Sequence, residues 1–311
     1  MTPVDPQSAL RQSGGAARRD ALLAHGVTGA ALSASYQRGE VLRPYRGTYC
    51  LPNTPNDLIT AASLRGQLAC VSACAWWGLN LIHSPDTVHV IVPKDRHPRD
   101  DRLRLLHLPG IHRADRLVDG RRIQPVAEAI DQAAWCTTPL EQLVIINSAL
   151  HSKRIDPLEP PHLTIGTEYR RAWIHANARS SADSVPESVA GAVLNAAGLR
   201  PAAQVARDHV GTVDLMVGGR HIIEIDGYEP HSGRDQFAED RRRDREISAQ
   251  RGWSLRYTYW DVMNDLLAFA LDVARIVGVR PDARLAARIR WMTTAPAGHL
   301  NRHVRRPGTV L

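Results

Sequence analysis

The stretch that decides the fold is residues 211–227, which read Gly-Thr-Val-Asp-Leu-Met-Val-Gly-Gly-Arg-His-Ile-Ile-Glu-Ile-Asp-Gly. Two short apolar runs are joined by Gly218-Gly219, a dipeptide that favours a tight turn between strands. Asp214 lies in the first run. Glu224 and Asp226 lie in the second and share one face, because side chains alternate along a strand. If the two runs pair as a hairpin, Asp214 comes close to Glu224.

Carboxylates on one face of a sheet repel one another unless a cation or a proton lies between them. A divalent ion held by Asp214 and Glu224, with water and phosphate oxygens completing its shell, removes this repulsion and activates a water for attack on phosphorus. Mg²⁺ is the natural ion for such an oxygen-rich site, and Mn²⁺ is an expected substitute. Solvated acids on the outer face of edge strands are the alternative interpretation of the same spacing.

Around these runs the sequence predicts a small mixed sheet flanked by helices, an α/β arrangement over residues 185–279. The small polar residues 179–185 mark the expected domain boundary. The basic segment 280–311 has seven arginines against one acid, and it is expected either to follow nucleic acid or to be a solvated end. The expected elements are helices over 186–197, 234–251 and 260–277, and strands over 203–206, 213–217, 221–226 and 253–258.

The amino-terminal part shows the order helix, short turn, helix, hairpin, which predicts a winged helix-turn-helix over residues 16–55. Residues 1–15, rich in Pro, Ser, Gln and Gly, are expected to form a flexible tail. Residues 56–178 are expected to form a small α/β middle domain. A short helical pair with a hairpin that is purely structural, or that contacts a protein, is the alternative to the winged helix.

If the winged helix is correct, its second helix over residues 28–38 presents Ser33, Ser35, Gln37 and Arg38. The hairpin has Gly47 at its tip and carries Arg43, Tyr45 and Arg46 on the wing. Small polar side chains let a helix approach the major groove, and basic wing residues meet phosphate or the minor groove.

The composition describes a globular chain of 311 residues, about two domains, with a net charge of +7 and a pI near 9.6. Of its 39 basic residues only Lys94 and Lys153 are lysine. Arginine pairs with phosphate oxygens and guanine edges, so a polyanion is the first partner to consider, although a GC-rich genome also enriches arginine. The four cysteines form no CxxC pair, and no apolar run is long enough to cross a bilayer, so a cytoplasmic protein without disulfides is expected.

Residues 185–262 resemble the Vsr-like branch of the PD-(D/E)xK nucleases, named for very-short-patch repair endonucleases. This resemblance implies a restriction-endonuclease-like α/β domain that hydrolyses phosphodiester bonds. The residues that carry it are Pro186-Glu187, Ala-Gly-Leu at 197–199, Val213-Asp214-Leu215, Ile-Glu-Ile-Asp-Gly at 223–227, His231, Asp-Arg-Arg-Arg-Asp at 240–244, Gly252-Trp253, Leu255-Arg256 and Asp261-Val262.

The resemblance implies a role for each site residue. Asp214 and Glu224 correspond to the two metal-binding acids, and Asp226 stands where most of these nucleases have lysine. His231, four residues after the glycine, is implied as general base or as a donor to the scissile phosphate. Glu187 is implied to hold a water or to support the metal ligands, although an acid in the first turn of a helix also complements the helix dipole.

Asp240 and Asp244 share one face of the charged helix and resemble the acids of the family's Arg-Asp motif. Salt bridges to neighbouring arginines are their expected role, ahead of support for the catalytic site. The expected DNA contacts are Arg241 and Arg242 on this helix, together with Arg38, Arg43 and Arg46 of the winged helix.

The amino-terminal half resembles the winged-helix and following domain of AbiEi-like antitoxins of type IV toxin–antitoxin systems. The residues that carry this likeness are Arg-Arg-Asp-Ala-Leu-Leu-Ala-His-Gly at 18–26, Gly39, Arg-Gly-Thr-Tyr at 46–49 and Ala-Trp-Trp-Gly-Leu at 75–79. Such a half recognises operator DNA or supports antitoxicity in that family.

Two hypotheses follow from the sequence. The first is an Mg²⁺-dependent endonuclease that cuts double-stranded DNA to leave 5′-phosphate and 3′-hydroxyl ends, in DNA repair or in defence against phages and mobile elements. The second is a DNA-binding regulator or antitoxin with an inactive nuclease-like domain, which would bring in a partner protein. A homodimer is left open, and no membrane partner is expected.

Overall fold

A computed structural model of the chain describes residues 4–92, 103–106, 122–158, 162–226, 234–250 and 252–295. The chain divides into two compact α/β units. Unit 1 comprises the residues up to Gly78 together with His83–Ala133, and unit 2 comprises Leu79–Ile82 together with the described residues from Ala134 onward. None of the described helices combines the length and the apolar character needed to cross a membrane.

Unit 1 begins with three helices and a three-stranded antiparallel sheet of strand order β1-β3-β2. Leu10, Leu22, Leu32, Val41 and Tyr49 form the core beneath them. Thr28 caps the third helix as expected, and Gly47 adopts a positive φ of 75° at the hairpin tip. The elements are α1 (Pro6–Gln12), β1 (Ala16–Arg18), α2 (Arg19–Ala24), α3 (Gly29–Gln37), β2 (Leu42–Tyr45) and β3 (Thr48–Cys50).

Three expectations for this part are wrong. Residues 5–13 do not belong to a flexible tail, because Asp5 caps α1 and Leu10 is fully buried in the core. The expected first helix is shortened, because residues 16–18 pair with β3 as a strand. Ser35 does not face solvent but is buried, and its hydroxyl donates to Glu40 at 2.8 Å.

The rest of unit 1 contains a second three-stranded sheet, of order β4-β5-β6, with helices packed around it. The apolar run Val-His-Val-Ile at residues 88–91 forms β5. Cys50, Cys70, Cys74 and Cys136, all of them described residues, form no disulfide bond in the structure. The elements are α4 (Asn56–Ser63), β4 (Gln67–Leu68), α5 (Cys70–Trp76), β5 (Val88–Ile91), β6 (Leu103–Leu106) and α6 (Val126–Ala133).

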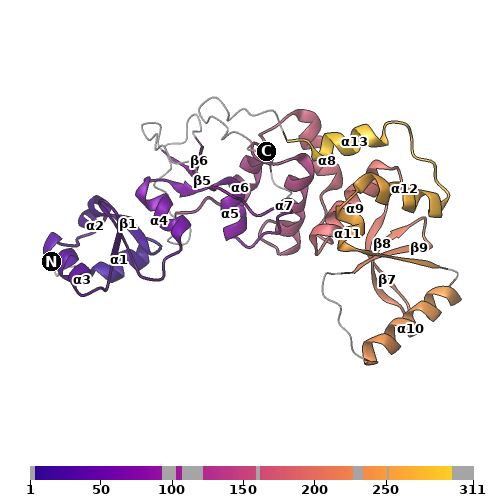
Figure 1. The fold of residues 1–311 in the computed structure, drawn as a ribbon, viewed down its shortest axis with the longest axis horizontal. Coiled ribbons are helices and arrows are strands. Elements are labelled where there is room, and N and C mark those ends of the chain that lie inside the picture. The colour runs from indigo at the N-terminus through magenta and orange to yellow at the C-terminus, as the bar shows by residue number, and fades with distance from the viewer. Residues whose placement is uncertain are drawn as a thin grey trace, which may run out of the picture. The chain divides into compact units, whose positions relative to one another are not determined.

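Unit 2 is built around a mixed four-stranded sheet of order β10-β9-β8-β7, in which only β9 and β10 run parallel. Helices α9, α11 and α12 lie on one side of this sheet and α10 lies on the other (Figure 1). The mixed sheet flanked by helices is therefore confirmed. The elements are α7 (Pro139–His151), α8 (Glu168–Asn177), α9 (Val185–Ala196), β7 (Ala202–Arg207), β8 (Gly211–Val217), β9 (His221–Asp226), α10 (Arg234–Ala249), β10 (Trp253–Thr258), α11 (Tyr259–Met263), α12 (Leu266–Val277) and α13 (Leu285–Thr293).

The division between the units differs from the boundary expected at residues 179–185. Helices α7 and α8 belong to unit 2 with the mixed sheet, because polar contacts join α7 to α9 and to the segment before it. The Asn147 amide donates to the Ser188 hydroxyl at 3.2 Å, and its carbonyl oxygen accepts from the Arg179 backbone at 2.8 Å. The small polar segment is thus a loop inside one unit.

The carboxyl-terminal elements of unit 2 also differ from expectation. The single helix expected over 260–277 is two helices, because Asp265 caps a new helix start by accepting from the Leu267 and Ala268 amides. Part of the expected basic end is helix α13, which buries Leu285 and Met292. Residues 296–311 of that segment lie outside the described residues.

Candidate functional site

The hairpin at the centre of the sequence argument is present. Strands β8 and β9 pair antiparallel, with Leu215 opposite Ile223 and Val217 opposite His221. The loop between them begins with Gly218 and Gly219 at φ of 59° and 72°, a region that glycine adopts without strain. One step beyond the Leu215–Ile223 pair, the same register places Asp214 opposite Glu224.

The outer strands extend this pair into a row of four polar residues across the sheet. Arg256 of β10 is in register with Glu224. On the other side, the pairs Ala203–Leu215 and Val205–Val213 flank Gln204 of β7 and Asp214. The row therefore runs Gln204, Asp214, Glu224, Arg256, with two acids between an amide and a guanidinium.

Asp214 is held from the strand beside it, since the Ile225 backbone amide donates to its Oδ2 at 2.8 Å. Burial raises the pKa of the Asp214 carboxyl above its ordinary value, and the negative charges of Glu187 and Asp226 raise it further. The Ile225 amide and the charge of Arg243 act in the opposite direction but do not cancel the burial. The folded site therefore resists an uncompensated charge at Asp214.

The pKa of Glu224 is raised for similar reasons. Burial raises the pKa of its carboxyl, and the charge of Asp214 raises it further. Arg243 of α10, whose Nη2 lies 3.1 Å from Glu224 Oε1, lowers it, and Arg256 does so from β10. Two adjacent, partly buried carboxyls whose pKa values are both raised are a donor set that fits a divalent cation.

Water or substrate must complete the shell of such a cation. Within the described part of the chain, Asp214 and Glu224 do not belong to a group of three or more side chains that lie close enough to hold an ion together. A pair of carboxylates with several retained waters is the arrangement that Mg²⁺ tolerates, because this ion dehydrates reluctantly.

The wider comparisons do not name a family. No protein-family model matches the chain, and no curated protein matches it significantly.

Glu187 lies in the first turn of α9 and is tied down by several donors. The Ser184 hydroxyl donates to its Oε1 at 2.7 Å, and the Gln204 amide donates to its Oε2 at 3.0 Å. Ser184 also caps the helix. Both interpretations of Glu187 thus have support: it completes the helix start, and its charge is felt at Asp214.

The remaining expected site residues have different outcomes. Asp226 is exposed at the end of β9, in register with Thr258, and its charge acts on both Asp214 and Glu224. His231 lies outside the described residues, as do the side chains of Asp240 and Asp244.

The arginines expected to contact DNA in unit 1 are not equivalent. Arg38 forms two hydrogen bonds with Glu40, at 2.7 and 2.8 Å, and this pairing, together with the Ser35 hydroxyl, lowers the pKa of Glu40 to about 2. Arg43 lies over the ring of Tyr49, 5.9 Å from its centroid. Arg46 is exposed beside the hairpin tip. Arg38 therefore has a partner within the protein, whereas the two wing residues are presented to solvent.

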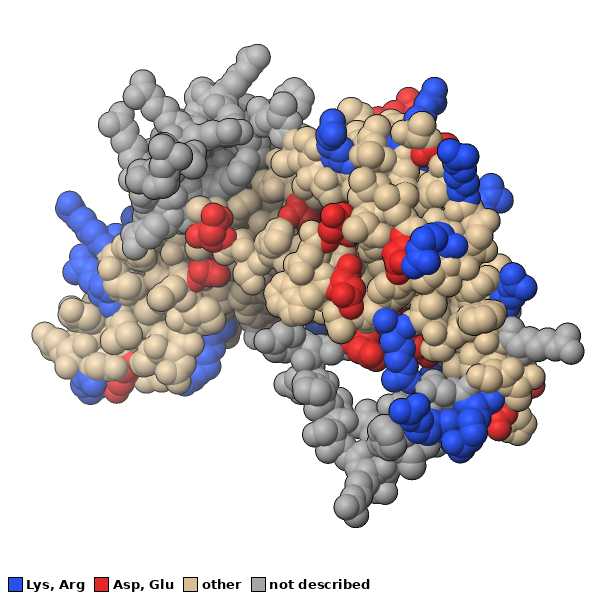
Figure 2. Space-filling model, turned by 45° about the vertical axis from the view of Figure 1, so that its right-hand side comes forward, with Lys and Arg blue, Asp and Glu red and all other residues tan. Residues whose placement is uncertain are grey.

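On α10, Arg241 is exposed, and Arg242 donates to the His209 carbonyl at 2.7 Å. Basic side chains gather at the lower right of Figure 2, on the part of unit 2 that carries α10, with acidic side chains above them on the same face. This arrangement offers positive charge next to the acidic region of the unit.

Sequence patterns missed three contributors to the site: Gln204, Arg243 and Arg256. Arg256 could have been found from the alternation of β10, which places it on the face opposite to Leu255. The three consecutive arginines of α10 carry no signal that separates Arg243 from its neighbours. Gln204 lies in an unremarkable strand, and its backbone φ of 49° is visible only in the structure.

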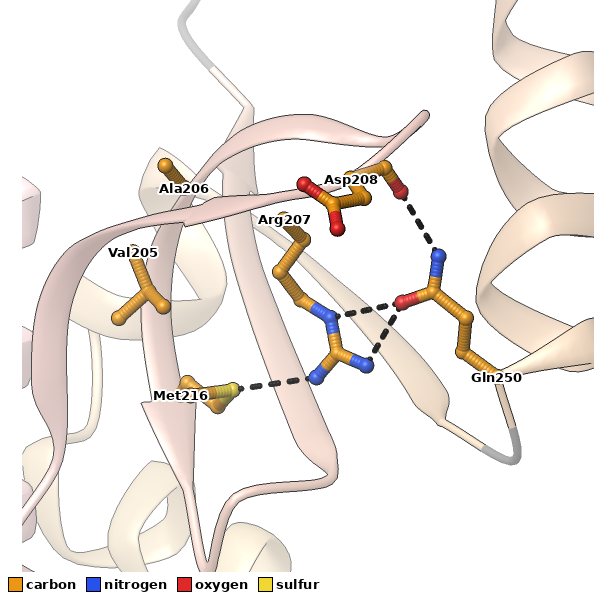
Figure 3. A pocket seen from close by; sticks show the side chains of 6 residues that line it. All are labelled: Val205, Ala206, Arg207, Asp208, Met216 and Gln250. Atoms are coloured by element: carbon orange, nitrogen blue, oxygen red, sulfur yellow. Dashed lines mark hydrogen bonds between the residues drawn. The ribbon is translucent and has the colours of Figure 1, made fainter.

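A shallow pocket lies elsewhere in unit 2, between the end of β7 and the end of α10 (Figure 3). Arg207 lines it, but its guanidinium donates twice to Gln250 Oε1, at 3.1 and 2.8 Å, and once to Met216 Sδ at 3.4 Å. Gln250 in turn donates to the Asp208 carbonyl at 2.7 Å. These contacts hold the end of α10 against β7. The polar side chains that line the pocket therefore have a structural role, and we do not assign a ligand to it.

Proposed function

We propose that the chain is a metal-dependent endonuclease that hydrolyses phosphodiester bonds of duplex DNA. The observation that supports this most is the placement of Asp214 beside Glu224 on paired strands, where burial raises the pKa of both carboxyls and the charge of Asp214 raises that of Glu224 further. Perturbed acids gathered at one point of a sheet are characteristic of functional sites. A divalent ion is the partner that relieves their repulsion.

In this proposal Asp214 and Glu224 hold Mg²⁺, for which Mn²⁺ substitutes. The bound ion supplies Lewis acidity and lowers the pKa of a coordinated water. The Ile225 amide fixes the orientation of Asp214, and Arg243 fixes that of Glu224. Arg256, exposed beside Glu224, is suited to contact a phosphate oxygen.

Water attack on phosphorus forms a new P–O bond and breaks the bond to the leaving oxygen, which takes up a proton. Asp226 and His231 are the proposed groups for handling the proton of the attacking water, because no lysine stands beside Glu224 on its strand. Glu187, held by Ser184 and Gln204, supports the acid pair electrostatically.

Unit 1 is proposed to bind the duplex. Its element order and its strand order β1-β3-β2 support a winged helix-turn-helix, in which α3 would approach the major groove. Strand β2 is exposed along its whole length and carries Arg43, and Arg46 follows it. These two arginines are the best-placed phosphate contacts of the unit.

Plasmid nicking tests the proposal. Wild-type protein with Mg²⁺ or Mn²⁺ should convert supercoiled plasmid to nicked or linear forms, and EDTA should stop the reaction. Asp214→Ala and Glu224→Ala should each lower the rate by at least about a hundredfold, because each removes a metal ligand. Asp208→Asn, at an exposed loop position, is the matched control and should cut at the wild-type rate. Equal nicking by wild type and both ligand variants would contradict the proposal.

A DNA-binding regulator or antitoxin without turnover is the second candidate, and the exposed wing of unit 1 favours it. It predicts tight, salt-sensitive binding to one operator sequence that does not depend on metal. Gel-shift assays with EDTA and with Mg²⁺ distinguish it from the nuclease when they are read beside the plasmid assay.

A further inference from the structure

We propose that Arg243 is a built-in counter-charge that sets the metal affinity of the Asp214–Glu224 pair and orients Glu224. This inference rests on the proposed metal-dependent function. It makes Arg243 a positioning residue, acting on the substrate only through Glu224.

The contacts of Arg243 show why it differs from the other arginines of α10. Its Nε donates to the Val210 carbonyl at 2.9 Å, and its Nη2 is shared between the Thr212 carbonyl at 3.3 Å and Glu224 Oε1 at 3.1 Å. The backbone at the start of β8 thus fixes the guanidinium from one side, and the Glu224 side chain of β9 contacts it from the other. A guanidinium held in this way cannot follow Glu224 if that carboxylate moves.

The geometry leaves the two oxygens of Glu224 with different roles. Oε1 accepts from Arg243, so Oε2 is the oxygen suited to a cation that also contacts Asp214. The carboxylate would then bind the cation through one oxygen. Without Arg243, Glu224 is free to rotate and to chelate through both oxygens.

Charge gives the direction of the effect on affinity. Arg243 offsets part of the negative charge of the acid pair, and replacement of Arg243 by a neutral residue makes the site more negative by one charge. A fixed positive charge a few ångströms from a divalent cation repels that cation, by an amount that corresponds to a factor of about ten in binding even at the dielectric constant of water. A neutral variant should therefore bind a divalent ion more tightly, on the order of tenfold, and yet cut more slowly.

The expected rise in metal affinity together with a fall in cutting rate distinguishes the proposal from a purely structural role of Arg243. If Arg243 only held α10 against the start of β8, its loss would make the positions of the two acids less well defined. Metal affinity and turnover would then fall together. The guanidinium is a quarter exposed, so water can reach the carbonyls that it leaves. We therefore expect the neutral variants to fold.

The experiment is titration of Mn²⁺ into protein without DNA, followed by electron paramagnetic resonance or calorimetry. Arg243→Gln and Arg243→Met are the two neutral variants, and thermal melting checks that they fold. Arg245→Gln removes the same charge from an exposed position of the same helix and is the matched control. Arg243→Lys keeps the charge and should keep an affinity close to that of wild type. Nicking rates at saturating Mn²⁺ complete the comparison.

The proposal predicts tighter Mn²⁺ binding with slower cutting for either folded neutral variant, and wild-type affinity for Arg245→Gln. Unchanged or weaker binding by a folded neutral variant overturns it, while a wild type that binds and cuts leaves the nuclease proposal standing. Failure of the wild type to bind Mn²⁺ would contradict both the proposed role of Arg243 and the proposed metal-dependent nuclease function. If neither neutral variant folds, Arg243→Lys decides, because loss of Mn²⁺ binding in that variant would show that packing and not charge is at stake.

Discussion

The side-chain amide of Gln204 donates to Glu187 across 3.0 Å, from a backbone position whose φ is 49°. Positive φ is uncommon for a residue with a side chain and costs roughly 1 kcal/mol or more. Gln204 adopts it in the middle of β7, next to Asp214 in the register of the sheet. The strand is thus held in an unfavourable conformation where its side chain reaches α9.

Substitutions at Gln204 should separate the hydrogen bond from the backbone strain. Gln204→Ala keeps the strain and loses the bond, and it should lower the free energy of unfolding by about 1 kcal/mol. Gln204→Gly loses the bond but relieves the strain, so its stability should lie within about 0.5 kcal/mol of wild type. Urea unfolding measures both. A glycine variant less stable than the alanine variant would show that the backbone is not strained.

Asp214→Asn should stabilise the metal-free protein at neutral pH. The folded-state pKa of Asp214 is raised above the ordinary value of 3.8, chiefly by burial, so ionisation of this group opposes folding. The stability that wild type loses in this way is lost as the pH rises through the raised pKa. Asparagine still accepts from the Ile225 amide but carries no charge. The advantage of the variant should be present at pH 7 and should vanish as the pH falls towards 3.8.

Addition of metal should make wild type more stable than Asp214→Asn. Saturating Mn²⁺ stabilises a protein that binds it in the folded state, by about 2.7 kcal/mol at a hundred times the Kd. Wild type should gain this stabilisation, and Asp214→Asn should gain little. Thermal melting with EDTA and with Mn²⁺ checks the reversal, and a variant that gains as much as wild type would remove Asp214 from the ligand set.

Arg170 of α8 should be among the most sensitive positions of unit 2. Its guanidinium is buried and donates to Gln142 Oε1, the carbonyls of Ala134, Thr137 and Thr138, and the Thr137 hydroxyl. Burial lowers its pKa to about 10, so it stays charged at neutral pH. Arg170→Met removes these five hydrogen bonds from the interior and should cost roughly 3–5 kcal/mol.

Two controls sharpen that prediction. Arg170→Lys should also be clearly destabilised, because an ammonium cannot span acceptors arranged for a planar fork. His175→Ala, at an exposed position of the same helix, should change stability by less than about 0.5 kcal/mol. Urea unfolding of the three variants supplies the measurement, and a small loss in Arg170→Met would contradict the argument from burial.

DNA binding through the wing should be visible in its salt dependence. Each phosphate contact that is lost lowers the slope of log K against log salt by about 0.9. Arg43→Ala with Arg46→Ala should therefore lower the slope by about 2 and weaken binding to all duplexes similarly. Arg11→Ala, whose side chain bonds Gln7 on the exposed face of α1, should leave the slope unchanged. An unchanged slope in the double variant would place the duplex elsewhere.

The sequence predicted the elements whose signals are local. Alternating apolar residues and a Gly-Gly turn define β8 and β9, and Gly47 marks the tip of the first hairpin. Helix α1 was missed because its composition is that of a linker. What makes it a helix is the Asp5 cap and the burial of Leu10, and the burial depends on residues far along the chain.

The candidate site likewise contains residues that the local sequence predicts and residues that only the tertiary fold brings in. Asp214 and Glu224 were predicted as neighbours because one hairpin contains both. The groups that tune them, Gln204, Arg243 and Arg256, come from other elements, and their positions depend on strand order and helix packing. The unit boundary was misplaced for a related reason: Asn147 joins α7 to the α9 region by side-chain contacts that composition does not reveal.

The parallel pairing of β10 with β9 has a consequence for biosynthesis. Hairpin β8–β9 closes over a few residues and forms quickly, whereas β10 can join it only after all of α10 has been made. While the chain leaves the ribosome, the two acids are therefore adjacent before Arg243 and Arg256 arrive. Under the proposed function, cellular Mg²⁺ would offset the repulsion between the acids during that interval, so folding of the nascent chain should depend least on its arginines when the ion is plentiful.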